Sequence, residues 1–182
     1  MGRAAAEGLL AAGVLPIVKH MPGHGRTRVD SHHDLPVLDA ALDDLDATDF
    51  APFRALADLP LGMTAHIRLT RLDDRPATAS AAAIALIRDR IGFSGLLMSD
   101  DIGMNALTGT PGERTAAAIA AGCDVVLACN MTRAELAAVT AAAGPLVPAA
   151  ARRAAAALAR RGPPDPGDDA ALRAELAALS GG

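Results

Sequence analysis

Four short apolar segments, separated by longer stretches rich in alanine and leucine, constrain the fold more than any other feature of the sequence. They comprise residues 14–18, 61–65, 95–99 and 124–129. Continuous apolar runs of this length are typical of strands in a sheet that is covered on both faces. Connections of about ten or more residues between such strands favour parallel pairing through right-handed crossovers. The pattern therefore predicts an α/β fold with about four parallel strands and flanking helices.

The stretches between and after these strands have helical periodicity and recognisable ends. Gly13 is expected to close the first helix, and Ser80 is placed to cap another. The predicted helices span residues 3–12, 39–58, 80–92, 112–121, 132–143, 148–161 and 170–179. The glycine- and proline-rich residues 162–169 read as a linker. We therefore expect one domain over residues 1–161, followed by a linker and a closing helix over residues 162–182.

The number of strands bears on the architecture. A complete eight-stranded (β/α)8 barrel has about 250 residues, whereas this chain has 182. Four strands fit either a small open sheet or part of a barrel whose earlier strands are absent. The chain opens on a predicted helix with no strand before it, which favours the partial barrel. Segments 14–18 and 124–129 would then be unpaired edge strands.

Composition excludes several classes of function. Hydrophobic residues make up 51% of the chain, which excludes a wholly disordered protein. The net charge of −4 argues against a nucleic-acid partner. No apolar run approaches the about 20 residues needed to cross a bilayer, so we expect no membrane partner.

The cysteines and the first residues bear on location. Residues 1–15 lack the charged start, apolar stretch and cleavage site of a signal peptide. Cys123 and Cys129 lie on one extended segment, which holds them too far apart to form a disulfide. Free thiols suit a reducing compartment, and we expect a cytoplasmic protein.

Polar residues capable of chemistry follow every predicted strand. They are Lys19 and His20, His66, Asp100 and Asp101, and Asn130. In parallel α/β folds, the working residues lie at the carboxyl ends of the strands. Position alone therefore predicts a functional site at this edge of the sheet.

The triplet Asp30-Ser31-His32 is one candidate for acid–base chemistry. In an extended loop, residues two apart point the same way, so Asp30 can hydrogen-bond one ring nitrogen of His32. A carboxylate partner fixes the tautomer and favours the imidazolium, which makes His32 a proton donor and later an acceptor. The alternative is an ordinary solvated loop.

Asp100 is a candidate nucleophile. A carboxylate at the end of a buried strand is held rigidly and partly desolvated, which suits a nucleophile that forms a covalent glycosyl intermediate. Asp100 and Asp101 are expected to point in different directions, so that one faces the site and the other caps the next turn. The alternative is a strand that merely ends in aspartate.

The segment from Lys19 to Gly25 is the third cluster. Lys19 is the only lysine among 17 basic residues and is suited to hold hydroxyl or anionic oxygens. The glycines allow backbone N–H groups to approach a ligand, although the segment lacks a phosphate-binding fingerprint. A zinc site is a rival interpretation, with candidate ligands His20, His24, His32 and His66. No HExxH, HxH or CxxC spacing is present, so we predict no metal and no cofactor.

Three segments in order carry a resemblance to a known family. They read KHMPGHGRTRVDSHHDLPVLD, MTAHIRLTRLDDRPATAS and IGFSGLLMSDDIGMNAL. Together they resemble the glycoside hydrolase family 3 β-N-acetylhexosaminidases of the bacterial NagZ type, over roughly residues 3–130. The resemblance implies part of a (β/α)8 TIM-type barrel. It also implies a retaining hydrolase that removes terminal β-linked N-acetylglucosamine through a covalent glycosyl-aspartate.

The resemblance assigns roles to individual residues. Lys19 and His20 correspond to the pair that contacts the sugar, and we place His66 with them as substrate-binding. His32 corresponds to the acid/base, Asp30 to its supporting carboxylate and Asp100 to the nucleophile. The implied partner is a small carbohydrate, an N-acetylglucosaminyl muropeptide, and the implied process is cell-wall recycling in the cytoplasm.

The chain also departs from the family pattern. The first strands of family barrels contribute an aspartate and arginines that grip the sugar, and this sequence has no counterpart, so it resembles the C-terminal part of the barrel. Two alternatives therefore stay open. One is a phosphorylase of the same fold, in which phosphate replaces water. The other is a catalytically silent fragment that binds sugar or takes part in an assembly.

Overall fold

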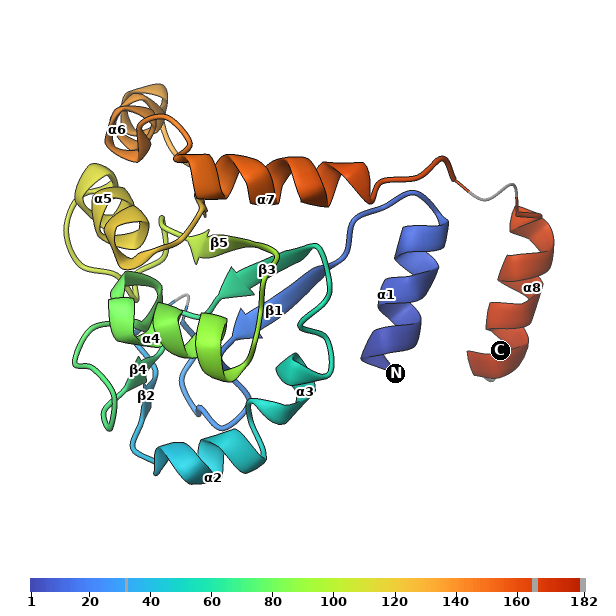
Figure 1. The fold of residues 1–182 in the computed structure, drawn as a ribbon, viewed down its shortest axis with the longest axis horizontal. Helices are drawn as coiled ribbons and strands as arrows, with labels where there is room; N and C mark the ends of the chain where they lie inside the picture. Colours follow the sequence, from blue (N-terminus) through green and yellow to red (C-terminus); the bar gives the residue numbers. More distant parts are fainter. Residues whose placement is uncertain (32, 165–166, 181–182) are drawn as a thin grey trace.

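A four-stranded parallel sheet forms the centre of the molecule. A computed structural model describes residues 1–31, 33–164 and 167–180. The strands are β1 (Ile17–Met21), β3 (Leu61–Thr64), β5 (Leu96–Asp101) and β6 (Val125–Leu127), and they lie side by side in that order. Ile17 pairs with Leu61, which in turn pairs with Leu96. Because all four strands run the same way, their carboxyl ends meet at one edge of the sheet (Figure 1). The predicted α/β fold with parallel strands is confirmed.

Helices connect and flank the strands (Figure 1). They are α1 (Gly2–Ala11), α2 (Leu42–Ala47), α3 (Ala51–Arg54), α4 (Ala81–Ala85), α5 (Pro111–Ala121), α6 (Arg133–Ala143), α7 (Pro148–Ala159) and α8 (Asp169–Ser180). A 3₁₀-helix, η1 (Ala77–Ala79), precedes α4, and a π-helix, η2 (Leu86–Arg90), continues it. Capping boxes at Thr110 and Thr132 begin α5 and α6, and Gly122 ends α5 in the left-handed conformation.

The single helix expected over residues 39–58 is wrong. The chain forms α2 and α3 with a turn between them, and two sequence features explain the break. Pro52 lies in the first turn of α3, where its missing N–H costs nothing, whereas in a helix interior it would remove a hydrogen bond. The side chain of Phe50 turns inward and is fully buried in the main core cluster.

The first strand also begins later than expected. The apolar pattern predicted residues 14–18, but pairing with β3 starts at Ile17 because Pro16 has no N–H to donate. Lys19 and His20 therefore belong to β1 itself, and Asp100 and Asp101 are the last two residues of β5. A two-stranded parallel sheet, β2 (Val37–Leu38) with β4 (Arg68–Leu69), lies outside the four strands that the sequence predicts. Strands of two residues are too short to show periodicity.

A buried aspartate links several elements at the amino ends of the strands, which is the end of the sheet opposite Lys19 and Asp100. Asp124 precedes β6 and accepts a hydrogen bond from the backbone N–H of Leu97 at 2.9 Å. Its two carboxylate oxygens also pair with Arg88 and Arg153, each at 2.7 Å. The Asp124 cluster thus links η2, β5, β6 and α7 at the amino ends of the strands.

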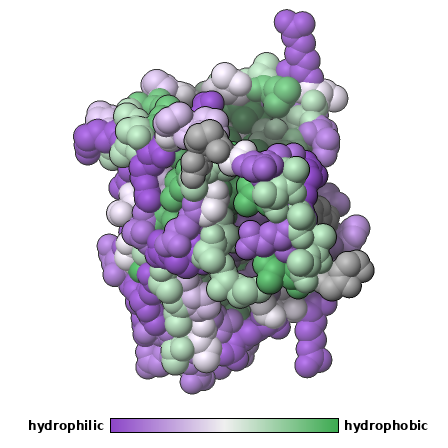
Figure 2. All heavy atoms as spheres, turned by 90° about the vertical axis from the view of Figure 1, so that its right-hand side faces the viewer, coloured by the Kyte–Doolittle hydropathy of each residue, from purple (hydrophilic) through white to green (hydrophobic). Residues whose placement is uncertain are grey.

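The C-terminal helix lies apart from the sheet, beyond α1 (Figure 1). None of its residues is buried, and Leu172, Leu176 and Leu179 are 59%, 66% and 79% exposed. The face on this side of the molecule mixes hydrophilic and hydrophobic patches (Figure 2). The division at residue 161 stays a prediction.

Two further sequence expectations concern the cysteines and the membrane. Cys123 and Cys129 are both free thiols, as the sequence predicted. Among the residues that the structure describes, no single helix has the length and apolarity to cross a membrane. Helices α6 and α7 reach that length only as a pair bent by 112°.

Candidate active site

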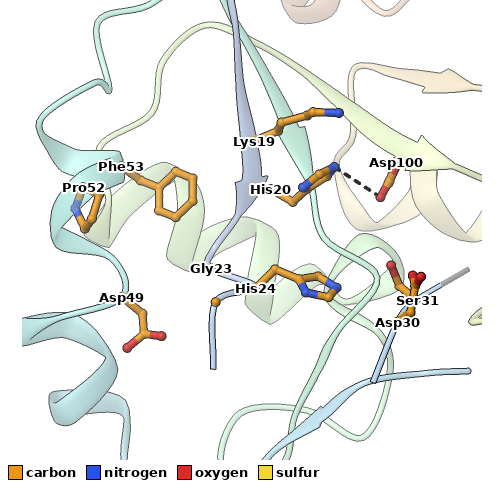
Figure 3. A pocket seen from close by; sticks show the side chains of 11 residues that line it. Lys19, His20, Gly23, His24, Asp30, Ser31, Asp49, Pro52, Phe53 and Asp100 are labelled. Carbon is orange, nitrogen blue, oxygen red and sulfur yellow. Dashed lines mark ion pairs between the residues drawn. The ribbon is translucent and has the colours of Figure 1, made fainter. Parts of the chain in front are cut away.

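A pocket of about 720 Å³ opens at the carboxyl ends of the strands. Its lining comes from the end of β1, the loop that follows it, the junction of α2 and α3, and the end of β5. The lining residues are Lys19, His20, Gly23, His24, Gly25, Asp30, Ser31, Asp49, Pro52, Phe53 and Asp100 (Figure 3). The structure therefore brings together four of the predicted site residues, Lys19, His20, Asp30 and Asp100.

His20 and Asp100 approach each other across the end of β3. The distance from His20 Nε2 to Asp100 Oδ2 is 3.6 Å, and the side chains are 30% and 14% exposed (Figure 3). Burial lowers the pKa of His20 below its usual value and Lys19 lowers it further, although Asp100 opposes the shift. His20 is therefore a neutral hydrogen-bonding group near pH 7.

The carboxylates of Asp100 and Asp101 point in different directions and have different partners, as predicted from the strand end. Oδ1 of Asp100 accepts a hydrogen bond from the backbone N–H of Asp101 at 2.8 Å, while Oδ2 faces His20 and the pocket. Oδ1 of Asp101 instead accepts from the backbone N–H groups of Gly103 at 2.9 Å and Cys129 at 3.0 Å. Asp101 thus ties β5 to the segment after β6, and Asp100 is the carboxylate offered to a ligand.

The acid/base pair is described only in part. Asp30 and Ser31 line the pocket on the side nearest Asp100 and His24 (Figure 3). His32, the predicted proton donor, lies outside the described residues. Its pairing with Asp30 and its role stay predictions.

His66 lies elsewhere than expected. It was placed among the substrate-binding residues, but its side chain is fully buried and does not line the pocket. Nδ1 lies 2.8 Å from Thr78 Oγ1 and Nε2 lies 2.9 Å from the carbonyl oxygen of Asp101. With both ring nitrogens engaged by the protein, His66 has none left for a substrate in this arrangement.

One wall of the pocket consists of residues that the sequence did not single out. Phe53 and Asp49 form it, and Arg26 anchors the loop to it through hydrogen bonds of 2.6 Å to Asp49 and 2.6 Å to Thr48. Asp49 is one of several aspartates in a stretch read as a single helix, so nothing singled it out. The turn that places it becomes visible only when the burial of Phe50 is known.

Gly23 fits closely against this wall. Its φ of +144° lies in a region that other residues rarely adopt, and a Cβ there would lie 3.2 Å from Cβ of Asp49. Beside it, His24 places its ring 6.2 Å from the ring of His20 and at 61° to it. Nδ1 of His24 is 2.9 Å from Thr27 Oγ1.

The zinc interpretation finds no ligand set in the described part of the chain. No group of three or more His, Cys, Asp or Glu side chains there is arranged to hold a metal ion. His20 and His24 lie together, whereas His66 is turned away into its own hydrogen bonds.

Comparison with known proteins identifies the family of this chain. The profile described as "Glycosyl hydrolase family 3 N terminal domain" matches residues 1–157. The chain therefore belongs to glycosyl hydrolase family 3, and the resemblance seen in the sequence is confirmed.

Two curated relatives are both named beta-hexosaminidase. The protein of Tolumonas auensis is 42% identical over 132 residues, which are 68% of this chain and 39% of that protein. The protein of Chromobacterium violaceum is 39% identical over 153 residues, which are 81% of this chain and 43% of that protein. The chain thus spans about two fifths of the length of these relatives.

Two solved structures are similar to this chain in fold. A glycoside hydrolase family 3 beta-N-acetylglucosaminidase from Paenibacillus sp. matches with a TM-score of 0.79 and 31% identity, over 88% of this chain and 34% of that one. NagZ from Neisseria gonorrhoeae, in complex with N-trifluoroacetyl-D-glucosamine, matches with a TM-score of 0.64 and 32% identity, over 87% and 53%. The predicted partial TIM-type barrel is confirmed.

Proposed function

We propose that this chain carries the nucleophile and sugar-contacting residues of a retaining glycoside hydrolase that removes terminal β-linked N-acetylglucosamine. The observation that carries the proposal is the environment of Asp100. One of its carboxylate oxygens is held by a backbone N–H, and the other points at His20 in an open pocket. Its relatives include a beta-hexosaminidase and a beta-N-acetylglucosaminidase, which supports the choice of sugar.

In the first chemical step, the free oxygen of Asp100 forms a bond to the anomeric carbon as the glycosidic bond breaks. The electron pair of the broken bond goes to the departing oxygen, which takes a proton from the His32 imidazolium. In the second step, neutral His32 takes a proton from water, and the water oxygen attacks the same carbon. The ester bond breaks, which releases the sugar and restores the Asp100 carboxylate.

His20 and Lys19 hold the sugar during both steps. Neutral His20 can donate or accept a hydrogen bond at a sugar hydroxyl, and the Lys19 ammonium donates only. In Figure 3 both side chains point toward the side of the pocket where Asp100 lies. Because remote contacts position the reacting centre, loss of either one lowers turnover as well as binding.

The acid/base bears on the class of substrate. Most retaining glycosidases pair two carboxylates, whereas here the family resemblance assigns the second role to a histidine. A leaving group that is itself anionic would be repelled by a second carboxylate but not by an imidazolium. This supports a muropeptide with an anionic sugar next to the N-acetylglucosamine, and hence cell-wall recycling. The free thiols of Cys123 and Cys129 support the cytoplasm as its location.

The direct test is turnover of a chromogenic N-acetylglucosaminide by the 182-residue chain and by Asp100→Ala and His32→Ala. We expect each substitution to lower kcat by on the order of a thousandfold. Equal rates in all three proteins would contradict the proposal. Product analysis with added phosphate separates the alternatives, because only a phosphorylase yields the sugar 1-phosphate. A chain that binds N-acetylglucosamine in calorimetry without turning over any glycoside would be the silent fragment.

A further inference from the structure

Three fully buried polar side chains form a hydrogen-bonded network near the carboxyl ends of β3 and β5. Thr64 ends β3, His66 follows it by two residues, and Thr78 lies in η1. The hydroxyl oxygens of Thr64 and Thr78 are 2.7 Å apart, and Thr78 Oγ1 is 2.8 Å from Nδ1 of His66. The network ends at the carbonyl oxygen of Asp101, which lies 2.9 Å from Nε2 of His66. Buried polar networks of this kind fix geometry only when every member has a partner.

The direction of the hydrogen bonds follows from what each atom can do. A backbone carbonyl only accepts, so Nε2 of His66 carries a proton and donates it to Asp101. Burial lowers the pKa of His66, so the ring is neutral and its Nδ1 accepts from the hydroxyl of Thr78. Thr78 Oγ1 also lies 3.2 Å from the carbonyl of Ala65, a longer contact than the one to His66. The arrangement selects the Nε2-protonated tautomer.

Three hydrogen bonds therefore fix the position of Asp101. Its carbonyl accepts from His66, and its carboxylate accepts from the N–H groups of Gly103 and Cys129. Its own N–H then points at Oδ1 of Asp100, at 2.8 Å. The orientation of the Asp100 carboxylate depends on that last hydrogen bond, because it leaves Oδ2 as the oxygen that faces the pocket.

We propose that His66 is a positioning residue for Asp100. By holding the carbonyl of Asp101, His66 aims the Asp101 N–H at one oxygen of Asp100 and presents the other to the substrate. The inference rests on the proposed role of Asp100 as nucleophile. It assigns His66 a task that requires no contact with the sugar, in agreement with its complete burial.

The test compares His66→Leu, which removes the donor, with His66→Gln, which keeps an N–H donor on a side chain of similar reach. Amide hydrogen exchange of the 182-residue chain, followed by NMR, gives a readout that needs no turnover. We expect the Asp101 amide to exchange at least about tenfold faster in His66→Leu and to be largely restored in His66→Gln. The Leu97 amide, held by Asp124 at the opposite edge, is the internal control and stays unchanged.

Kinetics add a second readout. Misplacing a nucleophile affects the chemical step, so kcat is expected to fall roughly ten- to hundredfold in His66→Leu while KM stays within about twofold. Unchanged Asp101 exchange and unchanged kcat in a folded His66→Leu protein would overturn the proposal. If His66→Leu fails to fold, ¹⁵N shifts of the parent histidine decide, and a ring protonated at Nδ1 instead of Nε2 overturns it. A parent without turnover but with the expected exchange changes would refute the proposed function alone.

Discussion

The two sides of the pocket are built in different ways. On the β5 side, Asp100 stands at the end of a central strand, and the next residue is fixed by His66, Gly103 and Cys129. On the other side, Asp30 sits in a loop that reaches the body of the protein through Arg26 and its hydrogen bonds to the turn between α2 and α3. Side chains on strands are held more precisely than side chains on loops, which suits the role of nucleophile that we propose for Asp100. The pocket is therefore held most rigidly on the side that is formed by the end of β5.

The largest expected effect comes from removing the acceptor that fixes the strand end. Asp101→Leu leaves the N–H groups of Gly103 and Cys129 without their carboxylate oxygen, which should lower the free energy of unfolding by about 1–3 kcal/mol. Urea unfolding measures this change. Asp101→Asn, which keeps an oxygen at the same place, is the matched control and should lose less than half as much. Equal losses in the two variants would show that the acceptor is not what fixes the strand end.

An intermediate effect is expected from the loop side. Arg26→Ala removes the hydrogen bonds to Asp49 and Thr48, but the arginine side chain is 43% exposed, so the free energy of unfolding should fall by no more than about 1 kcal/mol. Turnover should suffer more, with kcat/KM lowered about tenfold, because the loop that carries Asp30 loses its anchor. Arg28→Ala, a change in the same loop that leaves Arg26 in place, serves as the comparison. A large loss of stability with intact turnover in Arg26→Ala would contradict the claim that Arg26 matters more for turnover than for the free energy of unfolding.

The smallest expected effect is a dependence of stability on pH. Burial lowers the pKa of both His20 and His66 in the folded protein, so below pH 6.5 the unfolded chain binds more protons than the folded one. The contribution of these two histidines to the free energy of unfolding is therefore fully present above pH 6.5, and it is lost as the pH falls below that value. Urea unfolding between pH 7.5 and 5 should show this slope, and His66→Gln should reduce it. A slope that is the same in parent and variant would mean that His66 does not contribute to it.

Much of the site could be predicted because strand ends are visible in the sequence. The apolar run before Asp100 and the one before Lys19 placed both residues at the same edge of a parallel sheet. The exact start of β1 was harder, because the apolar run begins at Val14 and contains Pro16, whereas pairing with β3 begins at Ile17. The break between α2 and α3 was hidden for a similar reason, since it depends on the burial of Phe50.

The role of His66 could not be predicted from its position in the sequence. Following a strand suggested a substrate contact, but the ring is turned back toward the carbonyl of Asp101, 35 residues further along the chain. Nothing in either local sequence records that hydrogen bond. It arises only when β3 and β5 pair and bring the two strand ends together.

The Asp124 cluster has a consequence for protein engineering. It secures the amino ends of the strands with two arginines and a backbone N–H, at the edge of the sheet away from the pocket. This fastening lies at the opposite ends of the strands from the pocket, where conserved stabilising residues are found in TIM-type barrels generally. A library that randomises the wall around Phe53 leaves this fastening intact. Phe53 itself packs against two core clusters, so a library that is meant to stay folded keeps Phe53 and varies the residues around it.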